Sequence, residues 1–317
     1  MSIGGFIRRN LFWAKDRLFN NSMVRKQYDD IKEILENYEI GRKRVEKYLL
    51  NLLNHAANTT EFYKEFKGKS LSQFPLVNKA IYKENYKLFM SDIFKNQDLH
   101  TMSTSGSTGT PFTVVQDKRK RSRVIAELKL FGELCGYKSH EKMAFLRVLS
   151  EKTRKKRYIE FIENIYRLDT SSLNNESLER INNFIRSKRV QAILSYSSTL
   201  ELLARFIQDN NYTFRDYNVR SVIAGGEALD IETRRRLKDV FGERCMVVSR
   251  YSNQEMGILA QDTGENSKFI LNHGSYYFEC LKIDSDEPAE MGEVGRLVIT
   301  DLFNYAFPMI RYDTGDL

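Results

Sequence analysis

A hydroxyl-rich and glycine-rich stretch stands in the N-terminal half of the chain and reads Thr104-Ser105-Gly106-Ser107-Thr108-Gly109-Thr110-Pro111. Glycines let backbone N–H groups converge on an anion, and the hydroxyl groups of Ser and Thr add hydrogen-bond donors. Such a loop is typical of a phosphate-binding site, although its composition alone also fits a flexible linker. It is not a Walker A loop, because no Gly-Lys-Ser/Thr closes it.

The segments around this stretch alternate between helical and extended patterns. Apolar residues recur every three to four positions over residues 24–57 and again over residues 124–135, which predicts two helices and then a third. Short runs rich in β-branched residues alternate with further helical stretches at residues 112–115, 190–194, 219–224 and 245–249. This alternation predicts a doubly wound α/β fold with mixed sheets.

The pattern changes after residue 264. Two strands of alternating polarity, at residues 276–283 and 294–300, indicate an antiparallel, barrel-like β subdomain. We therefore predict an N-terminal helical region at 1–100, an α/β core at 101–263 and a β-rich subdomain at 264–317. The sequence stops at Leu317 without a terminal helix, which we interpret as a cut before a further small C-terminal domain.

Composition excludes several classes of protein. The 317 residues are 41% hydrophobic, which is enough for a substantial core, and no 18-residue apolar run predicts a transmembrane helix. Three cysteines, none in a C-x-x-C pair, fit reduced thiols in a cytoplasmic protein. Four histidines occur outside any metal-ligand spacing, so histidine-dependent chemistry is disfavoured.

The formal net charge of +8 is concentrated in two basic runs, at residues 118–123 and 152–157. Neither run accompanies a nucleic-acid recognition motif, so we expect no nucleic-acid partner. A solvated helix face, or a positive rim that attracts a polyanion such as ATP, fits these runs better.

The N-terminus carries apolar residues at near-helical spacing with basic residues between them. Charges interrupt every apolar stretch from Ile3 to Leu18, which excludes a secretory signal. A terminal helix docked on its own domain accounts for this pattern, and a helix lying on a membrane surface or against a partner helix has the same pattern.

The glycine-rich stretch and three later segments resemble the motifs of the adenylate-forming (AMP-binding) ligases, in the order of that family. All eight residues at 104–111 match its phosphate-binding loop, [ST]-[SG]-G-[ST]-T-G-x-P. Gly225-Gly226-Glu227 resembles its adenine-contacting turn, and Tyr251-Ser252-Asn253-Gln254-Glu255 resembles its Y-G-x-[ST]-E. The segment 308–316, Pro-Met-Ile-Arg-Tyr-Asp-Thr-Gly-Asp, resembles P-L-I-R-Y-x-T-G-D.

Some positions depart from these motifs. Ser252 replaces a glycine and Gln254 replaces a hydroxyl residue, which leaves the backbone detail of that turn open. No lysine follows Pro111, as in the phenylacetate coenzyme A ligase branch. Within that branch, Leu168-Asp169-Thr170 and Ser195-Tyr196-Ser197-Ser198 look like adenylating proteins of capsular polysaccharide biosynthesis, where Gly-Tyr-Pro-Ser is usual at the second segment.

The resemblance implies that the chain is the large N-terminal portion of such a ligase. A carboxylic acid and MgATP would give an acyl adenylate and pyrophosphate, and the full-length protein would pass the acyl group to a thiol, of coenzyme A or a carrier, or to an amine. The family places a bridging lysine on the small C-terminal domain. We therefore expect this chain to bind nucleotide but to be catalytically impaired.

The resemblance also implies roles for individual residues. Thr108 and Glu255 would be catalytic and would hold Mg²⁺, and Tyr251 would pack on adenine while Asp316 binds the ribose. The other nucleotide-binding positions would be Thr104, Ser105, Gly106, Ser107, Gly109, Gly225, Gly226, Glu227 and Ser252. The acyl pocket would include Tyr196, Ser197, Ser198, Ala224 and Asn253.

Two alternatives stay open at this stage. An adenylation fold can become a catalytically idle scaffold or binding module, which the departures at Ser252 and Gln254 allow. A kinase-like phosphotransferase would need its own glycine-rich loop and catalytic-aspartate motif, and the sequence contains neither.

Overall fold

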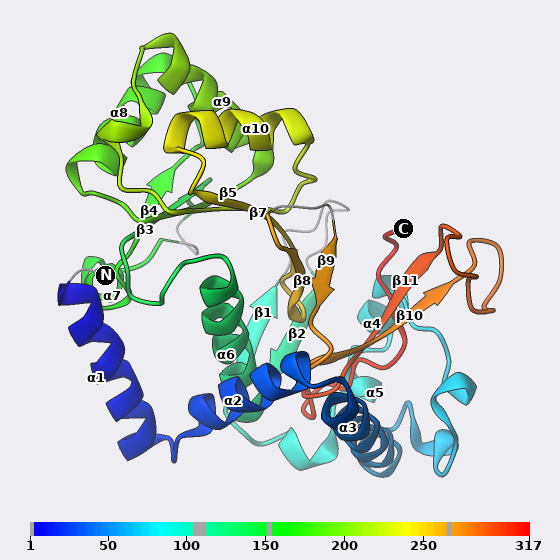
Figure 1. Cartoon of the computed structure of the whole chain (residues 1–317). Helices are drawn as coiled ribbons and strands as arrows, with labels where there is room; N and C mark the ends of the chain where they lie inside the picture. The colour runs from blue at the N-terminus through cyan, green and yellow to red at the C-terminus, as the bar shows by residue number, and fades with distance from the viewer. Residues whose placement is uncertain (1–2, 104–111, 151–153, 265–267) are drawn as a thin grey trace. The chain divides into compact units, whose positions relative to one another are not determined.

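The computed structural model describes residues 3–103, 112–150, 154–264 and 268–317 (Figure 1). These residues form two compact units, each with its own core. Unit 1 comprises Met1–Ser22, Glu127–Asn253 and Ile258–Leu271, and unit 2 comprises Met23–Ala126, Gln254–Gly257 and Asn272–Leu317. The division predicted from the sequence, at 100/101 and 263/264, stays a prediction.

Unit 1 is built on a seven-stranded sheet with strand order β4-β3-β5-β6-β7-β8-β9. β3 pairs in parallel with both β4 and β5, and the parallel pairing continues through β6 to β7, whereas β9 pairs antiparallel with β8. The strands are β3 (Met143–Arg147), β4 (Ile165–Asp169), β5 (Ala192–Ser195), β6 (Ser221–Gly225), β7 (Met246–Asn253), β8 (Gly257–Asp262) and β9 (Phe269–Leu271). The predicted mixed α/β fold is confirmed.

Both faces of the parallel strands are buried. Helices α8 (Asn175–Ser187), α9 (Ser197–Asp209) and α10 (Ile231–Phe241) lie together over one face (Figure 1). Ile193, Val222 and Val247 point into the core under these helices, while their neighbours Ala192, Ile223 and Val248 pack with Cys135 and Tyr137 on the opposite face. Strands buried on both faces read as continuous apolar runs, which is why the sequence shows them clearly.

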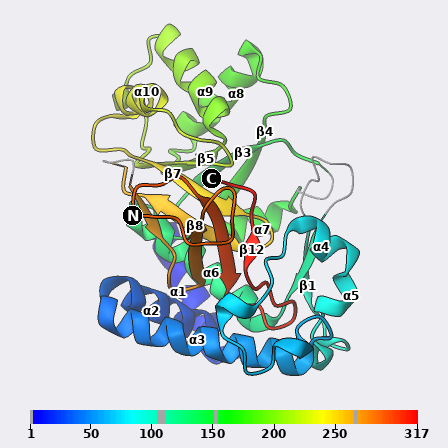
Figure 2. The ribbon, with the colours of Figure 1, turned by 90° about the vertical axis from the view of Figure 1, so that its right-hand side faces the viewer.

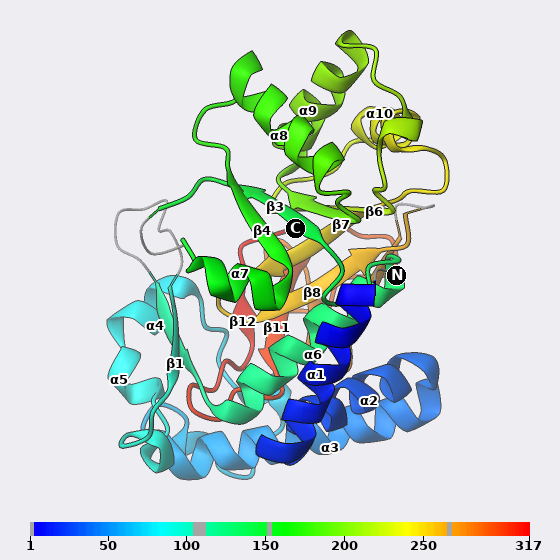
Figure 3. The same ribbon diagram turned by 90° about the vertical axis from the view of Figure 1, so that its left-hand side faces the viewer.

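Three further helices belong wholly or partly to unit 1. They are α1 (Ile3–Phe19), α7 (Arg157–Glu163) and the C-terminal half of α6 (Lys118–Leu134), along which α1 lies in Figure 3. A short 3-10 turn spans Phe214–Asp216. Within the described part of the chain, no helix has the length and apolar character needed to cross a membrane.

Unit 2 combines helices with two small antiparallel sheets (Figure 2). The predicted helices at 24–57 are present as α2 (Met23–Glu36) and α3 (Tyr38–Thr59), and α4 (Lys79–Glu84) and α5 (Tyr86–Phe89) follow. β1 (His100–Ser103) pairs with β2 (Thr113–Gln116), and the second sheet contains β10 (Tyr276–Leu281), β11 (Arg296–Asp301) and β12 (Tyr312–Asp313). Short 3-10 turns lie at Lys64–Phe66, Leu71–Gln73 and Asp92–Phe94.

The expectation that the basic run 118–123 forms a solvated helix face is wrong for two of its residues. Lys120 and Arg123 are both 0% exposed. Helix α6 begins at Lys118 rather than at 124, so positions 120 and 123 share the face that is buried in unit 2. Arg154 to Arg157, in the second run, are exposed as expected.

Each buried cation of α6 has specific partners. Lys120 Nζ lies 2.7 Å from Asp301 Oδ2 and donates to Tyr276 Oη at 3.1 Å. The Arg123 guanidinium donates to Gln27 Oε1 at 2.8 Å, to Asp30 Oδ2 at 2.6 Å and to Ser275 Oγ at 3.0 Å. Buried charges are tolerated only with such pairing, so these contacts tie α2, α6 and the segment before β10 together.

A buried lysine also lies under α1 within unit 1. Lys129 Nζ is 3.6 Å from the centre of the Phe12 ring and donates to Ser139 Oγ at 3.2 Å. Burial lowers the pKa of Lys129 to about 7 from its ordinary 10.5. The folded unit therefore holds this charge at a cost, which the aromatic ring and the hydroxyl partly offset.

We predict that Arg123→Met lowers the free energy of unfolding by about 3 kcal/mol, because Asp30 and Ser275 lose a buried partner. Urea denaturation measures this loss. Arg235→Gln is the control, since Arg235 forms exposed pairs with Glu232 and Asp239, and their loss should change stability far less. Equal effects of the two substitutions would contradict a structural role for the Arg123 contacts.

Lys129 gives a second prediction, on the pH dependence of stability. Below about pH 7 both the folded and the unfolded chain carry the proton; between pH 7 and 10.5 the unfolded chain binds it more tightly, so stability gains with rising pH. Lys129→Met should raise the free energy of unfolding by about 1–3 kcal/mol at pH 6 to 7, which is measured as a higher Tm. This gain in stability should shrink toward pH 10. The exposed Lys138→Met is the control, and a pH-independent effect of Lys129→Met would refute the prediction.

Candidate functional site

In unit 1, three predicted site segments lie at, or just after, the carboxyl ends of adjacent parallel strands. Ser195 is paired with Ala224, and Gly225 is paired with Arg250, so β5, β6 and β7 end at the same edge of the sheet. The carboxyl edge of parallel strands is where α/β proteins bind ligands. The structure thus brings together the segments that carry Tyr196, Ser197, Ser198, Ala224, Gly225, Gly226, Glu227, Tyr251, Ser252 and Asn253.

Glu227 connects two of these segments. Its carboxylate accepts a hydrogen bond from Ser198 N at 2.9 Å, and its carbonyl accepts one from Ser197 Oγ at 3.3 Å. Tyr196, the N-cap residue of α9, offers no capping side chain. Glu227 therefore supplies the negative charge that the N-terminus of α9 favours, a structural role that the sequence motif did not indicate.

Gly226 is required by the close approach of Tyr196. Its φ is +78°, and a Cβ at this position would lie 2.6 Å from Tyr196 Cε1. The adenine-turn motif and the acyl-pocket segment are therefore in contact. Tyr196 remains 44% exposed, so its ring covers the glycine while part of it faces solvent.

The end of β7 is held by a buried arginine. Arg250 donates through Nε and Nη2 to Gln261 Oε1, at 2.8 and 2.6 Å, and Gln261 Nε2 donates to Phe131 O at 2.9 Å. Tyr251 and Asn253 follow half-buried, and Ser252 between them is exposed. Sequence reasoning assigned no role to Arg250 or Gln261, because nothing local marks a partner eleven residues away.

In unit 2, Glu255 is a buried carboxylate next to a motif tyrosine. It is 6% exposed, and its Oε1 accepts a hydrogen bond from Tyr312 Oη at 3.2 Å. Gln116 Nε2, at the end of β2, donates to the Glu255 carbonyl at 3.4 Å. Two motifs separated by more than fifty residues thus meet at Glu255 in unit 2.

The turn that carries Asp316 is fastened to β11. Thr314 Oγ1 donates to Leu297 O at 2.9 Å and accepts from Asp316 N at 3.1 Å, and Leu297 N donates to Asp316 O at 3.0 Å. Gly315 provides the left-handed backbone of the turn, with φ +79°. Asp316 itself is exposed, so a fixed backbone presents this carboxylate to solvent.

Arg311 of the same motif is structural. Its guanidinium pairs with Glu279 at 3.1 Å and donates to Phe74 O at 3.0 Å. Burial raises the pKa of Glu279, while the Arg311 charge opposes that shift. The Arg311 carbonyl accepts from Val77 N at 3.0 Å, which places the strand before the Asp316 turn.

The predicted phosphate loop, with Thr104, Ser105, Gly106, Ser107, Thr108 and Gly109, lies outside the described residues. The strands on either side of it in the sequence are paired: Ser103 faces Thr113 in the β1–β2 ladder, and their hydroxyl oxygens are 2.9 Å apart. The roles predicted for these loop residues, including Thr108 as a catalytic and metal-binding group, stay predictions.

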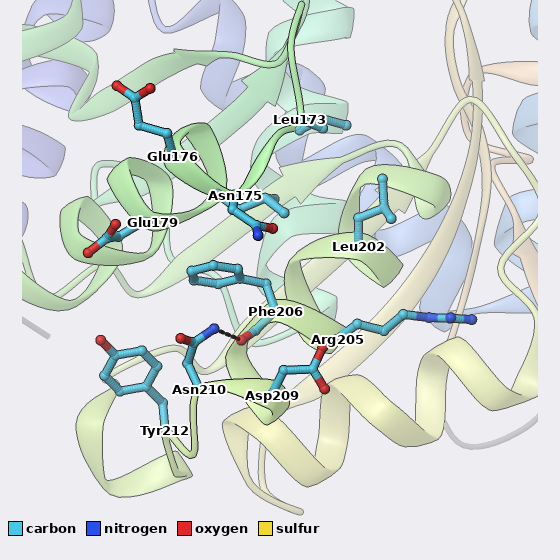
Figure 4. A pocket seen from close by; sticks show the side chains of 11 residues that line it. Leu173, Asn175, Glu176, Glu179, Leu202, Arg205, Phe206, Asp209, Asn210 and Tyr212 are labelled. Carbon is cyan, nitrogen blue, oxygen red and sulfur yellow. Dashed lines mark hydrogen bonds between the residues drawn. The ribbon is translucent and has the colours of Figure 1, made fainter.

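Unit 1 also contains a pocket of about 620 Å³ that no sequence motif indicated (Figure 4). Figure 4 shows Glu176, Phe206 and Tyr212 among its lining side chains, which come from α8, the C-terminal half of α9 and the segment after it. Of the predicted acyl-pocket residues, Tyr196, Ser197 and Ser198 lie at the other end of α9, and Ala224 and Asn253 lie on β6 and β7. This pocket is therefore separate from the candidate site.

Comparison with known proteins finds similar structures but no similar sequence. No protein-family profile matches the chain, and no curated protein matches its sequence. A solved structure of 2-hydroxyisobutyryl-CoA ligase, in the postadenylation state with R3-HIB-AMP, matches 86% of this chain with a TM-score of 0.69 at 14% identity. The same ligase in an open conformation, with 2-HIB-AMP and CoA, matches 86% of the chain with a TM-score of 0.65 at 17% identity.

The chain spans 62% of the first of these ligase structures and 68% of the second. Identities this low carry information about the fold and not about the substrate. Both matches agree with the family implied by the four sequence motifs. The chain therefore has the fold of the adenylate-forming ligases.

Proposed function

We propose that the chain binds MgATP and a carboxylic acid and takes part in forming an acyl adenylate with release of pyrophosphate. One observation supports this proposal: in a chain with this fold, residues that match the family's motifs lie at the carboxyl edge of β5, β6 and β7 in unit 1 and around Glu255 and Asp316 in unit 2. Fold alone would not specify an activity.

The residue inventory suits this reaction. A carboxylate is ionised at neutral pH, so it can attack the α-phosphate without a general base, which agrees with the absence of a histidine motif. The protein must neutralise the phosphates and align the attacking oxygen with the leaving pyrophosphate. In this assignment Tyr251 packs on the adenine, Asp316 accepts hydrogen bonds from the ribose hydroxyls, and Tyr196, Ser197, Ser198, Ala224 and Asn253 surround the acid.

The carboxylate of Glu255 is a suitable ligand for Mg²⁺. Among the described residues no cluster of three or more His, Cys, Asp or Glu side chains can hold a metal. Mg²⁺ commonly uses one or two carboxylates and completes its shell with water and phosphate oxygens, so a single buried carboxylate suffices when ATP is bound. Within the described residues Tyr312 Oη is the one hydrogen-bond partner of this carboxylate, and it orients the group. The ion would neutralise phosphate charge.

We further propose transfer of the acyl group to a thiol such as coenzyme A. The 2-hydroxyisobutyryl-CoA ligase of similar fold was solved with an acyl-AMP and CoA. An amine acceptor is the other outcome, and it would agree with a role in capsular polysaccharide biosynthesis suggested by the segments at 168–170 and 195–198. Mass spectrometry of the products formed from ATP, a panel of acids and either coenzyme A or an amine distinguishes a thioester from an amide.

A catalytically idle nucleotide-binding module is the second candidate function. It is favoured by the departures at Ser252 and Gln254, and by the use of the Glu227 carboxylate as a cap for α9. Such a module would bind ATP or an acyl-AMP analogue without acid-dependent pyrophosphate release. If the unmodified chain bound no nucleotide, both candidate functions would be contradicted.

We predict that Glu255→Gln lowers the affinity for ATP in the presence of Mg²⁺ by about tenfold or more, because a charged metal ligand is lost while the side-chain shape is kept. Isothermal titration with and without Mg²⁺ measures the effect, which should vanish without the metal. Tyr312→Phe is the matched control: it removes the hydrogen bond but leaves the carboxylate, so Mg²⁺ dependence should persist. Unchanged Mg²⁺ dependence in Glu255→Gln would place the metal elsewhere.

A separate prediction concerns the sugar. Asp316→Ala should weaken binding of ATP and AMP alike by about 10- to 100-fold, because the ribose loses hydrogen bonds to a charged group. Asp313→Asn is the control, since Asp313 pairs with Arg296 and should affect stability more than nucleotide affinity. Equal affinity of Asp316→Ala and the unmodified chain would remove Asp316 from the site.

A further inference from the structure

Most of the apolar side chains of helix α1 point away from the rest of unit 1. Its buried residues are Gly5 and Asp16, and Phe12 and Trp13 lie half-buried over Lys129. The opposite face carries apolar side chains at spacings of three to four residues. We call this set the α1 stripe; it consists of Ile3, Phe6, Ile7, Leu11, Ala14, Leu18 and Phe19.

The α1 stripe is strongly exposed. Its six large side chains are between 49% and 81% exposed. A surface helix of a soluble domain normally buries its apolar stripe and presents polar residues to water. Contiguous exposed apolar surface of this kind marks an interaction site.

Helix α7 extends this surface. Arg8 Nε, on α1, donates to Phe161 O at 2.9 Å, and the Arg8 guanidinium lies 4.4 Å from the centre of the Phe161 ring. The two helices are therefore neighbours within unit 1, as Figure 1 shows near the N-terminus. Tyr158, Phe161 and Ile162, which we call the α7 patch, are each 59% to 62% exposed.

Among the described residues, the exposed charged side chains on α1 and at the start of α7 are mostly positive. Lys15 and Arg17 are exposed on α1, and residues 154–157 before and at the start of α7 are four exposed basic side chains. The carboxylates of the same described segments do not add exposed, unpaired negative charge, because Asp16 is buried and Glu160 and Glu163 pair with Arg167. A surface that combines apolar side chains with exposed cations is complementary to an anionic lipid bilayer.

We propose that the α1 stripe and the α7 patch bind the surface of an anionic phospholipid membrane, with α1 lying in the plane of the interface. Its apolar side chains enter the boundary between head groups and acyl chains, while Lys15, Arg17 and the basic residues 154–157 contact lipid phosphates. A second copy of the chain fits less well, because two such faces would bring their cations together. The binding is peripheral and independent of the proposed ligase function.

Vesicle cosedimentation tests the proposal. The chain should sediment with phosphatidylcholine vesicles that contain phosphatidylserine, and far less with pure phosphatidylcholine. Ile7→Gln/Leu11→Gln should lower the partition by at least about tenfold, because two inserted side chains become polar. The matched control is Leu50→Gln/Ile283→Gln, which changes one leucine and one isoleucine of similar exposure elsewhere and should bind as the unmodified chain does.

Two further measurements locate the contact. Lys15→Gln/Arg17→Gln should weaken binding to the anionic vesicles by about tenfold and leave the weak binding to neutral vesicles unchanged. Trp13 is the one tryptophan of the sequence and lies on α1, so brominated lipids should quench the intrinsic fluorescence of the bound chain.

Three results would overturn the proposal. The first is no binding to either vesicle, and the second is equal binding by Ile7→Gln/Leu11→Gln and the unmodified chain. The third is a concentration-dependent dimer, seen by analytical ultracentrifugation, that Ile7→Gln/Leu11→Gln abolishes, because it would assign the α1 stripe to a second copy instead. Unchanged circular dichroism of each variant confirms that the fold is retained, which is expected because all substituted positions are exposed.

Discussion

Parallel pairing of β5, β6 and β7 is the constraint on which the candidate site of unit 1 depends. Parallel strands in register end at one edge, so the segments after Ser195, Gly225 and Arg250 gather there whatever their separation in sequence. The contacts at that edge are specific: Glu227 caps α9, and Gly226 gives room to Tyr196. Residues that a motif assigns to ligand binding thus also hold the edge together.

Buried cations organise unit 2 in a comparable way. Lys120 pairs with Asp301, Arg123 with Asp30, and Arg311 with Glu279, and each pair joins segments distant in sequence. Removing one partner of such a pair leaves a buried charge unpaired, which makes these positions intolerant of change. Arg311 sits next to Tyr312 in the chain, so a structural arginine and the tyrosine that orients Glu255 belong to one short motif.

The secondary structure was largely predictable, because buried strands and amphipathic helices leave a local period in the sequence. The strands expected at 190–194, 219–224 and 245–249 are present within two residues at their starts, and the two helices expected over 24–57 are present as α2 and α3. Side-chain partners such as Arg250 with Gln261, or Glu227 with Ser198, were not predictable. These contacts depend on strand order and on loop paths, which no local pattern encodes.

The sequence by itself determined the mixed α/β fold, the four ordered motifs and their likeness to the adenylate-forming ligases, because these are properties of residue order over short windows. Only the tertiary structure decided which charges are buried and which apolar groups are exposed. Lys120 and Arg123 look like solvated cations in sequence yet lie in the core, whereas the apolar stripe of α1 faces water. Burial depends on packing between segments that are distant in sequence. Two helices of similar composition can therefore bury different kinds of side chain, according to the segments that pack against them.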